Sequence, residues 1–154
     1  MEESQLNICL RSVNELPGAT VVNRRALRNI RGEKVNVDLN VRVVPDVEHS
    51  LISLIVTCSY IAVIGYIRTR LLVCSVVSTF EIKELEKFVE IQGDDVVVTA
   101  PLMKQMLGIS VGALRGIVSV RTQGTPLANS PLPMIDLTAL MYRLHYGKRP
   151  GRTV

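Results

Sequence analysis

The chain has 154 residues and a formal net charge of +4, with 47% hydrophobic and 21% charged residues. This length suits one domain whose core needs no disulfide or metal, and the composition excludes a chain that is disordered over most of its length. The small excess of positive charge does not by itself indicate a dedicated nucleic-acid binder.

The cysteines and histidines give no metal-ligand pattern. Cys9, Cys58 and Cys74 lie in apolar stretches without the short spacings that hold a metal, and His49 and His145 are far apart. We therefore predict no metal site and no cofactor. Three reduced core cysteines favour a cytoplasmic location.

The first 34 residues combine a short strand with a basic run. Residues 6–10 alternate apolar and polar side chains, which predicts a strand that ends before Leu16-Pro17-Gly18. The run that follows has no interleaved aromatic residue, so a solvated short helix or loop explains it as well as direct nucleic-acid binding does. Its five cations are Arg24, Arg25, Arg28, Arg31 and Lys34.

The clearest periodicity lies between Val35 and Val43, where apolar residues alternate with Asn, Asp and Arg. This pattern predicts a strand with one dry and one wet face. Two further strands, over about 50–63 and 66–80, complete an antiparallel meander. The uncharged stretch 50–67 is close to the shortest membrane span, but its alternation and β-branched residues favour a strand, so we predict no membrane insertion.

An acidic segment follows the meander. Residues 81–95 carry a net charge of −4, from six acids and two lysines. We interpret it as a solvated edge strand or hairpin that charge protects from aggregation, or as a surface that orients a partner. The charged residues are Glu81, Lys83, Glu84, Glu86, Lys87, Glu90, Asp94 and Asp95.

A long helix is predicted from Thr99, a good cap, to about Thr122, with Pro101 in its first turn. Gly108, Gly112 and Gly116 fall in one row of this helix, and each costs about 1 kcal/mol of helix propensity relative to alanine. Such a row indicates a close approach to the helix backbone. It is explained either by packing on the protein's own sheet or by a subunit interface.

The connector after this helix has three prolines within residues 125–133, so we expect no regular structure there and an extended path over the surface. Asp136 then caps a last helix that ends at Gly147. Leu127 and Leu132 of the connector, together with the apolar stripe of this helix, can form a lid against the sheet edge. The stripe consists of Leu137, Leu140, Met141 and Leu144.

The segments 121–126 and 132–141 resemble the Arg-Gly-Thr-aromatic-Pro segment and the Pro-Val-Asn-Phe-x-Ala-Leu motif of the SecB family of bacterial export chaperones. The order of predicted elements is similar too. The resemblance implies an α+β fold with a four-stranded antiparallel sheet, a long helix, a Pro-rich crossover and a short C-terminal helix. It places one domain over residues 1–147 and leaves a basic flexible tail over 148–154. It further implies a dimer or dimer of dimers with the long helices at an interface.

No phosphate loop and no catalytic group of side chains is recognisable, so we predict that the chain is not an enzyme and has no catalytic residues. The resemblance implies an ATP-independent holdase-type chaperone for unfolded or preprotein polypeptides, with Gly108, Gly112 and Gly116 at the oligomer interface. Candidate residues of its client groove, for which a plain core role is equally open, are Tyr60, Tyr66, Leu127, Leu132, Leu137, Met141 and Leu144.

Two further points concern partners. A dedicated interaction protein built on the same scaffold, with a single partner such as a toxin–antitoxin or mobile-element protein, is the alternative function. The export motor SecA, which classical members of the family meet through an acidic sheet face, is not expected as a partner because this chain is basic.

Overall fold

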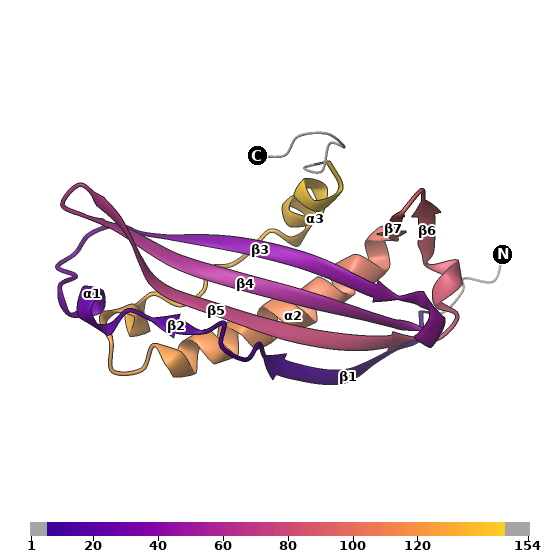
Figure 1. Cartoon of the computed structure of the whole chain (residues 1–154), viewed down its shortest axis with the longest axis horizontal. Helices are drawn as coiled ribbons and strands as arrows, with labels where there is room; N and C mark the ends of the chain where they lie inside the picture. The colour runs from indigo at the N-terminus through magenta and orange to yellow at the C-terminus, as the bar shows by residue number, and fades with distance from the viewer. Residues whose placement is uncertain (1–5, 147–154) are drawn as a thin grey trace.

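A computed structural model describes residues 6–146 of the chain. Its main sheet is antiparallel and has the strand order β1-β5-β4-β3, with the short β2 also paired to β5 (Figure 1). The strands are β1 (Ile8–Glu15), β2 (Val21–Val22), β3 (Val35–Asp46), β4 (Leu51–Ile64) and β5 (Ile67–Ile82). The predicted meander is confirmed, and the first strand joins it beside β5.

The alternation within β4 explains why the uncharged stretch forms a strand. Its even-numbered side chains from Ile52 to Tyr60 are fully buried. On the opposite face the hydroxyls of Ser53 and Thr57 lie 2.9 and 2.6 Å from those of Thr79 and Ser75 on β5. In the described part of the chain, no helix is long and apolar enough to cross a membrane.

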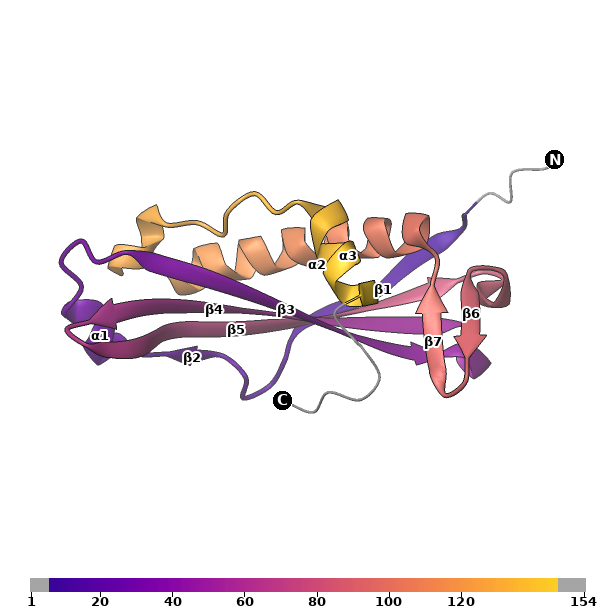
Figure 2. The ribbon, with the colours of Figure 1, turned by 90° about the horizontal axis from the view of Figure 1, so that it is seen from above.

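Helix α2 (Ala100–Arg121) covers the dry face of the sheet, as Figure 2 shows. The proline at its start, where no intrahelical N–H bond is needed, fits the predicted beginning. The side chains of Leu102, Met106 and Leu114 are fully buried against the sheet. At the other end Arg121 pairs with Glu15 of β1 at 2.6 Å, which fixes the end of the helix to the sheet.

The connector differs from the expectation in one respect. The prediction that it has no regular structure is wrong at η3 (Pro126–Asn129), a single 3-10 turn. Proline supplies the φ angle that the first residue of such a turn needs, and the Thr125 hydroxyl accepts a hydrogen bond from the Leu127 N–H. The chain then runs without regular structure to α3 (Leu137–Tyr146), whose Ala139 N–H donates to the Asp136 carboxylate at 3.1 Å.

The two ends of the sheet carry different additions (Figure 1). Helix α1 (Arg24–Arg28) lies at the end formed by the β4–β5 turn, so the basic run contains the short helix that we expected. The turn η1 (Val47–His49) joins β3 to β4. The acidic segment at the opposite end forms η2 (Leu85–Lys87) and the hairpin of β6 (Val89–Gln92) and β7 (Asp95–Val98). The predicted tail at 148–154 and the helix end at Gly147 lie outside the described residues.

Candidate functional site

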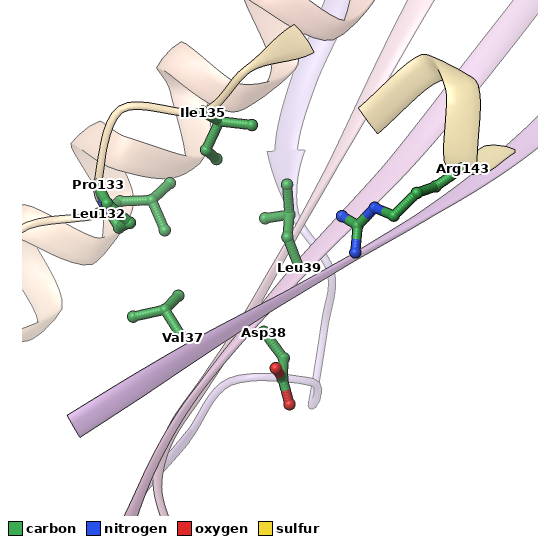
Figure 3. Close-up of a pocket in the computed structure, with 7 residues that line it drawn as sticks. All are labelled: Val37, Asp38, Leu39, Leu132, Pro133, Ile135 and Arg143. Atoms are coloured by element: carbon green, nitrogen blue, oxygen red, sulfur yellow. The ribbon is translucent and has the colours of Figure 1, made fainter. Parts of the chain in front are cut away.

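A groove of about 360 Å³ lies between β3 and the segment that leads into α3. Figure 3 shows Val37 and Leu39 rising from β3 toward connector residues, with Arg143 reaching over the same space from α3. We call it the connector groove. It is lined by Val37, Asp38, Leu39, Leu132, Pro133, Ile135 and Arg143.

The strand that borders the groove is an edge of the sheet. Strand β3 pairs with β4 on one side, and within the described residues no strand pairs with its other side. Backbone N–H and C=O groups along such an edge can pair with an incoming extended segment. Val37 and Leu39, on the half-buried face of β3, supply apolar surface next to this edge. The groove therefore offers apolar side chains next to backbone groups that can pair with an extended segment.

Arg115 of α2 fixes the connector wall of the groove. Its Nε donates to the carbonyl oxygen of Leu132 at 3.3 Å, and a terminal guanidinium nitrogen donates to that of Pro133 at 3.2 Å. The side chain of Leu132 is only 3% exposed. The connector wall is therefore held by one buried apolar side chain and two hydrogen bonds from a charged donor.

Tyr60 does not line the groove, although it neighbours a residue that does. It is the β4 residue paired with Val37, and its side chain is fully buried. Its hydroxyl has no hydrogen-bond partner within the described part of the chain. Burial raises the pKa of this phenol to about 12, so the group stays protonated and can donate a hydrogen bond.

The groove has one positively charged and one negatively charged side chain, and they are placed differently. The Asp38 carboxylate points away from it (Figure 3) and lies 3.4 Å from the guanidinium of Arg68 on β5. Arg143 faces the groove from α3. The connector itself, residues 122–135, contains no acidic residue. The groove thus presents a cation, while its one carboxylate is already paired.

The structure does not gather all seven groove candidates. Leu132 lines the groove, and α3 places Leu137, Met141 and Leu144 near the core, with Met141 buried and the two leucines half-buried. Leu127 is buried within η3. Tyr66 lies fully exposed at the β4–β5 turn, at the end of the sheet that also carries α1 (Figure 1).

Sequence reasoning missed six of the seven lining residues, among them the apolar Val37, Leu39 and Ile135 and the cation Arg143. The alternation of β3 marked the first two as apolar and inward, but nothing in the sequence placed β3 at the sheet edge facing the connector. No pattern marked Ile135 or Arg143 as part of a groove. Only the return of the connector along α2 brings them there.

The glycine row faces away from the sheet. Gly108, Gly112 and Gly116 are all exposed, so the interpretation that they pack on the protein's own sheet is wrong. A Cβ atom at Gly112 or Gly116 would contact nothing within 4 Å, and one at Gly108 would touch only Leu137 of α3. The protein's own fold therefore gives no packing reason for the row.

No family model and no curated protein matches the chain. Among solved structures, it is similar to a Mycobacterium tuberculosis SecB-like chaperone, Rv1957, determined in complex with a ChAD peptide from the HigA1 antitoxin Rv1956. The two chains are 16% identical and superpose with a TM-score of 0.51 over 84% of this chain and 89% of the other. This likeness shows that the fold is SecB-like.

Proposed function

We propose that this protein is an ATP-independent holdase-type chaperone that binds unfolded polypeptide segments in the connector groove. The observation that carries the proposal is a groove with apolar side chains from β3 and the connector, directly beside an edge strand whose outer side has no strand partner in the described structure. An unfolded client exposes apolar side chains and unpaired backbone groups, and both find partners there. The SecB-like fold supports the proposal.

In this proposal the client enters where the connector passes Leu132. An apolar client side chain replaces Leu132 against Val37 and Leu39, while the client backbone pairs with the outer side of β3. As Leu132 moves, the Tyr60 hydroxyl becomes accessible and donates a hydrogen bond to a client carbonyl. The client thereby supplies the acceptor that the folded chain lacks.

We further propose that the exposed glycine row pairs two copies of the chain. The row crosses the outer face of α2, and small residues let two helix backbones come close. A pair of chains offers two grooves to one client and raises the effective concentration of the second contact. Sedimentation velocity should show an oligomer that Gly112→Leu reduces to a monomer with an unchanged circular dichroism spectrum.

Suppression of client aggregation tests the proposed function. At near-stoichiometric amounts, the protein should keep a chemically reduced or heat-unfolded client from scattering light. Leu39→Gln should weaken this suppression because it places an amide in the groove. Val44→Gln, on the same strand but with an exposed side chain, is the matched control and should retain it. No suppression by the unaltered chain at a several-fold excess contradicts the proposal.

A dedicated factor for one partner is the second candidate function. It is favoured by the structural neighbour, whose complex contains a peptide from one antitoxin. Clients of unrelated sequence distinguish the two functions. A general holdase should protect several reduced clients at similar ratios, whereas a dedicated factor should protect none of them and bind a single peptide segment tightly.

A further inference from the structure

A second pocket, of about 240 Å³, lies where α1 meets the start of the connector. Arg24 and Arg28 line it together with Leu27, Gly124, Thr125 and Pro126. The two arginines are four residues apart on α1, so their side chains lie on the same face of the helix. We call this pocket the arginine pocket.

The arginines of this pocket are available to a ligand. Neither Arg24 nor Arg28 forms an ion pair with any of residues 6–146, and both are exposed. The nearby carboxylate of Glu33 accepts a hydrogen bond from the Arg31 N–H, which is the main reason that its pKa is lowered. The Thr125 hydroxyl is also engaged, because it donates to the Thr122 carbonyl oxygen. Among the lining side chains, the two guanidinium groups are therefore the polar groups without a hydrogen bond or ion pair to any of residues 6–146.

Positive charge predominates around the arginine pocket, where Glu33 is the one acidic residue of the segment 24–34. Arg25, Arg31 and Lys34 lie in the same segment, and Arg70 is close because its carbonyl oxygen accepts a hydrogen bond from the Asn23 side chain, which caps α1. The acidic hairpin of β6 and β7 lies at the opposite end of the sheet (Figure 1). At physiological ionic strength, dissolved ions screen the charges of the hairpin from those of the arginine pocket over that distance. An anionic group approaching the arginine pocket thus meets net attraction, because residues 24–34 carry five cations and only one carboxylate, that of Glu33.

The connector joins the two pockets. Residues 124–126, near its start, line the arginine pocket, and Leu132, Pro133 and Ile135, near its end, line the connector groove. Because positions 126 and 132 are six residues apart, the path between the pockets is at most about 20 Å. An extended client segment of about six to eight residues can therefore contact both pockets at once.

From this arrangement we infer that the protein selects apolar client segments that are flanked by acidic residues. The apolar side chains occupy the connector groove and the carboxylates pair with Arg24 and Arg28. The inference rests on the proposed function and names its substrate class. Arg143 supports the same preference inside the groove, where Asp38 is already paired with Arg68.

Peptide binding measured by fluorescence anisotropy tests the inference. The probes are 14-residue peptides with a central apolar stretch. One peptide carries two glutamates at its N-terminal end and another carries them at its C-terminal end, in each case about seven residues from the centre of the apolar stretch. Matching versions of both peptides carry glutamine or lysine in place of the glutamates. At about 50 mM salt the better glutamate peptide should bind about threefold to tenfold more tightly than its glutamine version, and the lysine version more weakly still. At 0.5 M salt the difference should fall below about twofold.

Matched variants locate the effect. Arg24→Gln/Arg28→Gln should bind the glutamate and glutamine peptides equally while keeping the affinity for the glutamine peptide. Lys83→Gln/Lys104→Gln removes the same charge from exposed positions elsewhere and should keep the preference.

Three results would overturn the inference. Equal binding of the glutamate and glutamine peptides overturns it and leaves the proposed function standing. The inference is also overturned if an oligonucleotide displaces the glutamate peptide from the unaltered chain but not from the arginine variant, because the arginine pocket would then be a nucleic-acid site. The proposed function would again stand. If none of the peptides binds, the proposed function fails and the charge preference fails with it.

Discussion

Tyr60 gives the sharpest test of how the groove is built, because its hydroxyl is fully buried without a partner in the described structure. An unpaired buried polar group costs about 1–3 kcal/mol. Tyr60→Phe removes that group and keeps the ring that packs in the core. We therefore expect the free energy of unfolding to rise by about 1 kcal/mol, which for a chain of this size raises Tm by about 2–4 °C. Client affinity should fall at the same time, because the donor proposed for the client carbonyl is gone.

Urea unfolding at pH 7, followed by circular dichroism, measures the first effect, and peptide anisotropy measures the second. Tyr66→Phe is the matched control, since Tyr66 is fully exposed on a turn, and it should change neither quantity. A loss of about 1 kcal/mol in Tyr60→Phe would show that the hydroxyl has a hydrogen-bond partner in the folded protein. That result would refute the reasoning that the Tyr60 hydroxyl lacks a partner until a client carbonyl accepts its hydrogen bond.

Two further predictions concern titratable groups. Hydrogen bonding by Arg121 holds the pKa of Glu15 below its ordinary 4.5, so the stability that this pair contributes is present above pH 4.5 and is lost as pH falls through the lower folded-state value. Glu15→Gln should therefore lower Tm at pH 7 and make the acid decline of Tm shallower; an unchanged decline would contradict it. Burial raises the pKa of the Cys74 thiol, and raises that of Cys58 to about 12, so iodoacetamide at pH 8 should modify Cys9 alone until urea is added, as counted by mass spectrometry.

The strands of the sheet could be predicted because each is determined by the pattern of its own neighbouring residues. The alternation from Val35 to Val43 and the even-numbered apolar residues of β4 each fix one buried face, and a slip of one residue would expose that face. The cap at Asp136 is likewise a property of a few neighbouring residues. Each of these elements appears where the sequence placed it.

The groove could not be predicted, because it depends on two segments that are far apart in the sequence. Val37 and Leu132 are both plain apolar residues in the sequence, and only the turn η3 sends the connector back toward β3. Tyr60 occupies a buried position in the alternating pattern of β4, like its neighbours Val56 and Cys58. The sequence therefore gives no sign that its hydroxyl lacks a hydrogen-bond partner. The spacing of the glycines puts them on one side of α2, but it does not determine whether that side faces the sheet or solvent.

The anchors of the connector decide which part of it can open. Moving a buried leucine into water costs about 1.5–3 kcal/mol, and both Leu127 and Leu132 are buried. Lifting the whole connector exposes both side chains, and lifting only the part near Leu132 exposes one; either movement breaks the hydrogen bonds that Arg115 donates to the carbonyl oxygens of Leu132 and Pro133. Lifting only the part near Leu132 costs about half of the free energy of exposing both leucines to water. One apolar client side chain of similar size can offset this cost by taking the place of Leu132. The connector should therefore open at Leu132 while η3 stays docked, so the arginine pocket keeps its shape while the client enters.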